Sequence, residues 1–172
     1  MRLTLQSMEP ALDQTVRAVA RRVARAVPWT VKTRRAPAGS DNSEGVIRID
    51  ASPAVAAVDE GITVGITGRH IEVPGLDDPF GYAFPADRVA VVSTPPLRSE
   101  TGTASLFEGR LCKEVIHEAG HVLGMPHCMN QTCVMHYSQA LHDTDSKGCT
   151  FCPACALELS KLPGIGRESR GR

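Results

Sequence analysis

Long apolar runs are missing from this chain of 172 residues. No stretch approaches the roughly 20 apolar residues that a membrane-spanning helix needs, so we expect no membrane partner. The first ten residues, MRLTLQSMEP, lack the apolar segment of a secretion signal, which favours a cytoplasmic protein. An excess of charge is missing too, because 19 basic residues balance 19 acidic ones. A nucleic-acid partner therefore has no overall electrostatic support.

The composition that remains is typical of one globular domain. Apolar residues make up 42% of the chain and charged residues 22%, which excludes a disordered or fibrous protein. There is no internal repeat, and we expect a single domain over residues 1–162, a monomer, with a flexible tail at 163–172. Basic residues gather in 1–35 and near the C-terminus. A solvated helix face explains them best, and a weak attraction for acidic peptides or RNA is the alternative.

The apolar periodicity predicts alternating strands and helices. Alternation predicts a strand over 2–6, and spacings of three and four predict a helix from Pro10 to Val27. A second long helix should begin near Ser105, where Ser105 and Glu108 have the spacing of a capping box. A short helix is expected over 155–162. Further strands are expected over 29–32, 61–67 and 88–93, the last of them in the interior of the sheet.

The segments between these elements are richer in turn-forming residues. Residues 46–60 are ambiguous: 46–50 suit a short strand, and a helix could start at Pro53. Three segments have the composition of loops: 36–45, 74–81 and most of 125–151.

The second long helix carries the pattern HExxH. His117 and His121 stand four residues apart, which places both imidazoles on one helix face, as two zinc ligands require. Glu118 lies about 100° round the helix from His117. From there it cannot easily share the metal but can reach a water bound to it, which is the place of a general base.

His127 follows His121 by six residues and completes the pattern HExxHxxGxxH. On a continuing helix it would lie about 240° round and face away. Gly124 removes this difficulty, because glycine tolerates the positive φ of a sharp turn. Three neutral imidazoles leave a fourth tetrahedral position for water, which predicts a catalytic zinc rather than a closed structural one.

The six cysteines all lie between positions 112 and 155, interleaved with histidines, and this favours metal ligands over a disulfide framework. Two pairs, Cys128 with Cys133 and Cys152 with Cys155, predict a second, structural zinc with four thiolate ligands. Cys149 with Cys152 is a rival for the second pair. Cys112 is expected to be a small apolar residue of the core.

Three segments together resemble the archaemetzincins, a branch of the metzincin zinc peptidases. They are HEAGHVLGMPHC, Cys133-Val-Met135 and CPAC, and weaker similarity extends upstream through ITVGIT, VPGLDDPFG and RVAVVS. The resemblance implies a compact α/β metzincin-like fold with a twisted mixed sheet and an active-site helix. It implies an upper sheet subdomain to about residue 124, a loop-rich lower subdomain over 125–162, and a cleft between them.

The resemblance also implies roles for residues beyond the ligands. Met135 would form the methionine turn, an apolar floor beneath the imidazoles. Tyr137 follows two residues later, as in metzincins whose mobile tyrosine approaches the metal, and it could stabilise the transition state. The alternative is a tyrosine packed beneath the turn. Gly68, Arg69 and His70 depart from the family, which often has acidic residues there.

The sequence therefore predicts a zinc-dependent peptidase that takes a peptide or protein substrate and holds two zinc ions. Glu118 would take the proton of the attacking water and pass it to the leaving amine. The alternative is a two-zinc peptide-binding protein of weak or no activity on the same scaffold. A zinc-ribbon nucleic-acid module would leave HExxHxxGxxH unexplained.

Overall fold

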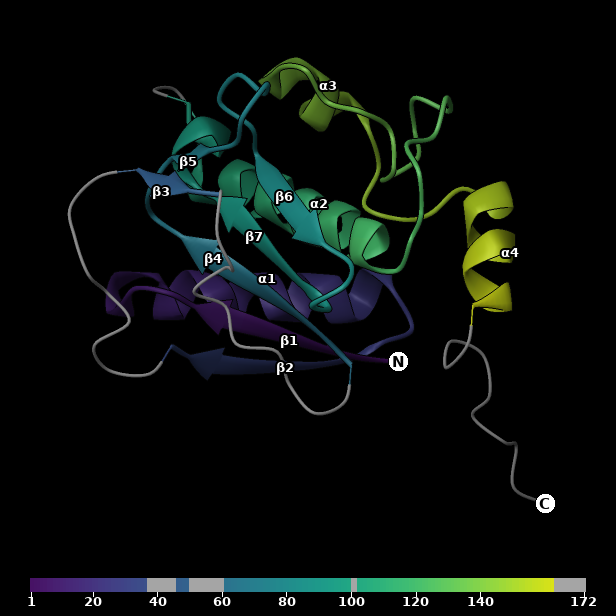
Figure 1. The fold of residues 1–172 in the computed structure, drawn as a ribbon, viewed down its shortest axis with the longest axis horizontal. Helices are drawn as coiled ribbons and strands as arrows, with labels where there is room; N and C mark the ends of the chain where they lie inside the picture. The colour runs from purple at the N-terminus through teal and green to yellow at the C-terminus, as the bar shows by residue number, and fades with distance from the viewer. Residues whose placement is uncertain (37–45, 50–60, 100–101, 163–172) are drawn as a thin grey trace.

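The computed structural model describes residues 1–36, 46–49, 61–99 and 102–162 (Figure 1). Its main sheet has five strands in the order β2-β1-β4-β7-β6, all parallel except β6, which is antiparallel to β7. The five strands are β1 (Arg2–Ser7), β2 (Thr30–Arg35), β4 (Ile62–Thr67), β6 (Gly81–Phe84) and β7 (Val89–Ser93). A smaller parallel sheet pairs β3 (Ile47–Arg48) with β5 (Ile71–Glu72).

Two long helices cover one face of the main sheet. Figure 1 shows α1 (Asp13–Ala26) and α2 (Ala104–Val122) side by side, with α1 against β1 and β2 and with α2 against β4, β7 and β6. Two short helices follow in the C-terminal part, α3 (Leu141–Ser146) and α4 (Pro153–Lys161). Short 3₁₀ helices, Pro10–Leu12 and Pro95–Leu97, precede α1 and α2.

Strand β7 shows how the sheet separates two apolar clusters. Its side chains alternate, so that Ala90 and Val92 join the large core beneath the helices, while Val89 and Val91 join a smaller cluster with Ile71 on the opposite face. Because both faces are covered, all five residues of β7 are buried. The sequence-based prediction of an interior strand here is confirmed.

The predicted mixed α/β class is confirmed, as are the strands expected near residues 2–6, 29–32 and 61–67. The N-terminal helix ends at Ala26, two residues before Pro28, as the pattern indicated. The short strand considered for 46–50 is present as β3, and the last helix begins at Pro153, two residues earlier than expected.

The predicted capping box at the start of α2 is wrong. The hydroxyl of Thr103 accepts a hydrogen bond from the N–H of Leu106, so Thr103 is the N-cap. Ser105 and Glu108 instead bind the guanidinium of Arg22 on α1, at 3.0 and 3.1 Å. Their side chains join the two helices rather than cap one of them.

Among the elements that escaped the sequence analysis are the two-residue strand β5, the strand β6 and the helix α3. β6 begins at Gly81, the last residue of a segment assigned to a loop. It was not predicted because the prolines and glycines around it obscure the pattern of a strand of only four residues. α3 lies within the region expected to be loop. It was not predicted because six residues are too few to show a helical period. The helix considered from Pro53 and the tail at 163–172 lie outside the described residues. No helix of the described part is long and apolar enough to cross a membrane.

Candidate active site and metal centres

The C-terminus of α2 positions the three histidines. α2 ends at Val122, and Gly124 follows with φ of 84°. The N–H of Gly124 donates to the carbonyl of His121 at 2.9 Å, and the N–H of Met125 donates to the carbonyl of Gly120 at 2.9 Å. These two bonds form a Schellman motif, which reverses the chain as the sequence predicted.

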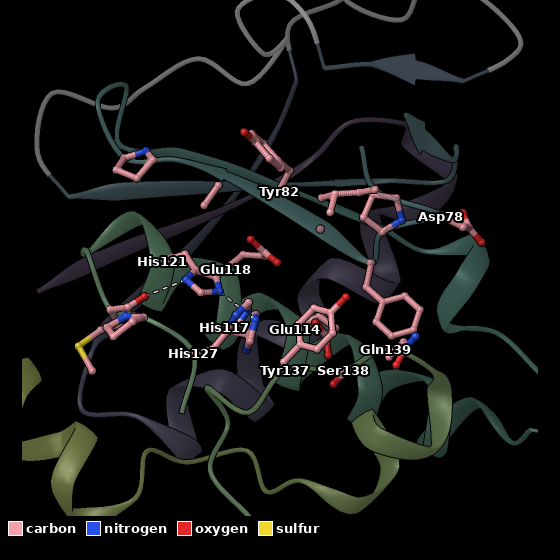
Figure 2. A pocket seen from close by; sticks show the side chains of 18 of the residues that line it. Asp78, Tyr82, Glu114, His117, Glu118, His121, His127, Tyr137, Ser138 and Gln139 are labelled. Atoms are coloured by element: carbon pink, nitrogen blue, oxygen red, sulfur yellow. Dashed lines mark hydrogen bonds between the residues drawn. The ribbon is translucent and has the colours of Figure 1, made fainter. Parts of the chain in front are cut away.

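After this reversal, His127 lies beside the two helical histidines. Its ring centroid is 5.3 Å from that of His117 and 4.7 Å from that of His121. One ring nitrogen from each of the three lies within 4.8 Å of the other two. Figure 2 shows the three imidazoles directed into the same space.

The hydrogen bonds of two imidazoles determine which nitrogen can bind a metal. Nδ1 of His117 lies 2.8 Å from the carbonyl oxygen of Val134, and Nδ1 of His121 lies 2.8 Å from that of Met125. A carbonyl only accepts, so Nδ1 carries the proton in both rings and Nε2 carries a lone pair. Burial lowers the pKa of His117 well below its usual value and also lowers that of His121, which keeps both rings neutral.

The two Nε2 atoms lie only 3.0 Å apart. Two lone pairs at that distance repel each other unless a cation lies between them. Ligands of one tetrahedral zinc stand about 3.3 Å apart, given Zn–N bonds of about 2.0–2.1 Å. The three-histidine site therefore fits zinc.

Glu118 lies at the cleft side of this site and is only 6% exposed. Its carboxylate packs against β6, where a Cβ on Gly81 would come within 2.7 Å of Oε1, so only glycine permits this approach. Burial raises the pKa of Glu118 to about 8, the charge of Glu114 adds to the rise, and Lys147 opposes it. A dication among the imidazoles would favour the carboxylate form.

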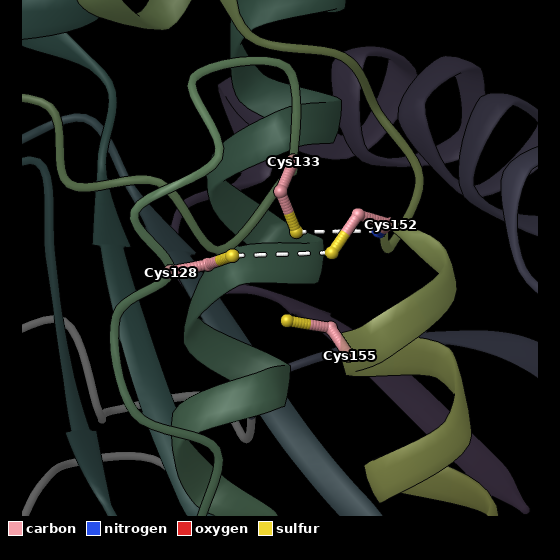
Figure 3. Close-up of side chains that lie close together, drawn as sticks. All are labelled: Cys128, Cys133, Cys152 and Cys155. Atoms are coloured by element: carbon pink, nitrogen blue, oxygen red, sulfur yellow. Dashed lines mark hydrogen bonds between the residues drawn. The ribbon is translucent and has the colours of Figure 1, made fainter.

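Four cysteine sulfurs form the second site. Cys128, Cys133, Cys152 and Cys155 offer Sγ atoms that all lie within 4.8 Å of one another, and Figure 3 shows them pointing toward a common centre. The Sγ atoms of Cys128 and Cys152 are 3.9 Å apart. Four thiolates around one zinc stand about 3.8 Å apart, given Zn–S bonds of about 2.3 Å, so this set also fits zinc.

The start of α4 favours a thiolate at Cys152. Cys152 is the N-cap of α4, and hydrogen bonding from the backbone N–H of Cys155 lowers the pKa of the Cys152 thiol to about 7. Cys149, the rival considered from sequence, is not one of the four clustered cysteines. Cys112 is buried in the main core, which raises the pKa of its thiol to about 12.

Met135 connects the two sites. It is fully buried, and its backbone carbonyl accepts a hydrogen bond from the N–H of Cys128 at 2.9 Å. Its sulfur lies so close to α2 that a Cβ on Gly120 would be 2.4 Å from it. The side chain thus packs beneath the helical turn that carries the histidines.

A cleft of about 490 Å³ opens above the three histidines. One wall is β6 with the segment that precedes it, and the other is the segment 137–139, which follows Met135 (Figure 2). Tyr137 is 53% exposed, and its ring centroid lies 5.0 Å from that of His127. A ring so exposed is not packed beneath the turn, which was the alternative considered from sequence.

The cleft also contains residues that the sequence analysis did not single out. Gly81, Phe80 and Tyr82 line the β6 wall, and Glu114 lines the floor. Glu114 precedes Glu118 by four residues on α2. This spacing places both side chains on one helix face, and it is the feature of the sequence that could have identified Glu114 as a residue of the cleft. Of the segment Gly68–His70, His70 contacts a residue of the cleft lining, since its Nδ1 is 2.7 Å from the carboxylate of Asp78.

Comparison with known families matches the part of the chain that contains both candidate metal sites. A model described as peptidase family M54 matches residues 52–161, more than half of the chain. The archaemetzincin of Pyrobaculum aerophilum is 40% identical over 125 residues, which cover 71% of this chain and 76% of that protein. The archaemetzincin of Aeropyrum pernix is 43% identical over 103 residues, which cover 59% of this chain and 55% of that protein.

Solved structures of similar proteins share this fold. The crystal structure of archaemetzincin from Archaeoglobus fulgidus, in complex with malonate, has a TM-score of 0.72 and 28% identity, covering 92% of this chain and 99% of that one. A zinc-dependent peptidase from Methanocorpusculum labreanum has a TM-score of 0.74 at 22% identity, covering 91% and 98%, and shows the shared fold.

Two separate ligand sets predict two zinc ions per chain. Changing Cys155 to Ser should leave one, because three thiolates bind zinc more weakly than four. Cys149→Ser is the matched control and should keep both ions, since Cys149 lies outside the clustered sulfurs. Elemental analysis of the purified proteins measures the content. Loss of a zinc from the Cys149 variant would contradict the assignment.

The contact between Gly120 and Met135 predicts a loss of stability in Gly120→Ala. The added methyl would overlap the Met135 sulfur, which we expect to lower the free energy of unfolding by about 1–3 kcal/mol. Gly109→Ala, on the same helix with open space around it, should be neutral or stabilising by up to about 1 kcal/mol. Chemical denaturation of the zinc-loaded proteins compares them, and equal stability would contradict the prediction.

Proposed function

The chain belongs to peptidase family M54 and to the archaemetzincins, and on this premise we propose that it hydrolyses peptide bonds in the cleft between β6 and α2. The observation that carries the proposal is the pair of Nε2 atoms of His117 and His121, 3.0 Å apart, with Glu118 beside them at the wall of the same cleft. His127 completes the ligand set, and the four-cysteine site has a structural role.

The edge of the sheet offers a place for an extended peptide. Among the described strands, β6 pairs only with β7, and its other side borders the cleft. A peptide that pairs with this edge would bind through its main chain, which suits substrates of varied sequence. Its scissile bond would then pass over the three histidines.

His117, His121 and His127 would hold a zinc ion, which would supply a Lewis acid to polarise the scissile carbonyl and to lower the pKa of a bound water. Glu118 acts as general base and then as general acid. Its carboxylate takes the proton of the attacking water and delivers it to the leaving amine. The close packing of Glu118 against Gly81 holds the carboxylate at the wall of the cleft, where the water attacks.

We further propose that Tyr137 donates a hydrogen bond to the carbonyl oxygen as negative charge develops on it. The support is its place in the cleft, half-exposed and beside His127.

Replacing Glu118 with Gln should lower kcat by about 10²- to 10⁴-fold on a peptide library, because the variant keeps the shape but loses the base. Zinc content and the midpoint of thermal unfolding should stay unchanged. Glu158→Gln, an exposed residue of α4, is the control and should behave like the parent. Binding of peptides by the zinc-loaded parent without any cleavage would favour the alternative, a two-zinc peptide-binding protein.

Replacing Tyr137 with Phe should lower kcat by about 10²- to 10³-fold, because one donor to the developing oxyanion is lost. KM and zinc content should change little, since the ring and the metal ligands remain. Steady-state kinetics on a cleaved peptide measures both constants. Hydrolysis at the parent rate would remove Tyr137 from the mechanism and leave Glu118 and the histidines unaffected.

A further inference from the structure

A buried ion pair beneath the cleft has no part in the proposed chemistry. Nζ of Lys147 lies 2.9 Å from Oε1 of Glu114, and the two side chains are 0% and 3% exposed. The hydroxyl of Thr144 donates to the same carboxylate oxygen at 3.2 Å. Removing two charges from water is costly, and such a pair often contributes little to stability. The significance of the pair therefore lies in the groups that it connects.

The pair joins the active-site helix to the opposite wall of the cleft. Glu114 lies on α2, one turn before the zinc ligand His117, and lines the floor of the cleft. Besides its bond to Glu114, Nζ of Lys147 donates to the carbonyl oxygen of His136 at 3.3 Å. His136 directly precedes the wall segment 137–139. One buried ammonium thus bridges the floor and the wall.

Other bonds already hold α3 on α2. Arg110 forms two hydrogen bonds of 2.7 Å to the carboxylate of Asp145. Nζ of Lys113 donates to the carbonyls of Thr144 and Asp145 at 2.8 and 3.0 Å. Docking of α3 therefore does not require Lys147, and what Lys147 adds is the bond to His136.

The remaining bonds of His136 stay within its own loop. Its N–H donates to the carbonyl of Cys133 at 2.9 Å, and its Nδ1 lies 2.9 Å from the carbonyl oxygen of Cys128. Neither bond reaches α2. At the far end of the wall, Gln139 and Ala140 donate to Asp143 of α3. Two residues before His136 the loop is already bonded to α2, where the carbonyl oxygen of Val134 lies 2.8 Å from Nδ1 of His117. Among the bonds described for His136 itself, only the one to Lys147 connects it to α2, through Glu114.

We propose that Lys147 is a positioning residue: with Glu114, it sets the distance between the wall 137–139 and α2, and thereby the width of the cleft that receives a substrate side chain. The inference rests on the proposed peptidase function of this cleft. It assigns the pair an effect on the binding of bulky substrates, separate from metal binding and additional to the opposing electrostatic effects of its two charges on Glu118.

A charge-free double variant, Glu114→Gln with Lys147→Met, tests the proposal. Each single change would leave one buried charge without its partner and could unfold the protein, whereas the double change removes both charges. The matched control is Arg110→Met with Asp145→Asn, which removes an ion pair that touches α3 but not the wall. Elemental analysis and thermal unfolding select variants that keep two zinc ions and a folded state.

The decisive readout compares two hydroxamates. Acetohydroxamate binds zinc but carries no side chain for the wall to contact, while a peptidyl hydroxamate with a bulky apolar side chain needs the wall in place. The double variant should bind acetohydroxamate as the parent does but bind the peptidyl hydroxamate at least about tenfold more weakly. In hydrolysis of a peptide with such a side chain KM should rise, and kcat should fall as well, because the wall also carries Tyr137. The control should keep both affinities.

Two results would overturn the proposal: parent-like affinity of the double variant for the peptidyl hydroxamate, or an equal loss for both hydroxamates, which would place the effect at the metal. If the double variant does not fold, Lys147→Arg replaces it, because a guanidinium keeps the charge with a different reach, and the same two results apply. A parent protein that binds both hydroxamates but cleaves no peptide would contradict the proposed function and not this inference.

Discussion

The reversal of the chain at Gly124 is the constraint on which the site depends. A helix alone can present two of the three imidazoles, and the third arrives only because a glycine adopts positive φ one residue beyond the helix cap. The same turn brings the carbonyl of Met125 to Nδ1 of His121, which fixes the tautomer that leaves Nε2 free for a metal. One backbone conformation thus provides both the ligand set and its orientation.

Helix α2 extends this arrangement into the rest of the molecule. Its apolar face packs on β4, β7 and β6, while residues spaced by three and four form a continuous polar ridge. The N-terminal half of the ridge, from Arg110 to Glu114, holds the segment that includes α3 and Lys147. The C-terminal half carries His117, Glu118 and His121. The position of the cleft wall and the position of the ligands are therefore set by the same helix.

The two metal sites are joined through the chain and through packing. His127 and Cys128 are adjacent yet belong to different sites. Between them and α2 lies Met135, which bonds to Cys128 through its backbone and packs against Gly120 through its side chain. Ordering of the four-cysteine site therefore also orders the loop on which the third histidine depends, in a region with little regular structure of its own.

The sequence by itself determined the three-histidine ligand set and the presence of a second, cysteine-rich site, because HExxHxxGxxH and the paired cysteines place their donors through local spacing, and a helical turn or a short loop transmits that spacing directly. It also determined the buried strands, whose apolar patterns are strong. Only the tertiary structure decided between Cys149 and Cys155, located β6 at the cleft, and revealed the pair of Lys147 and Glu114. These three depend on contacts between residues distant in sequence. From sequence alone a lysine is expected at the surface. The structure shows Lys147 buried beside Glu114, which lies 33 positions earlier in the chain.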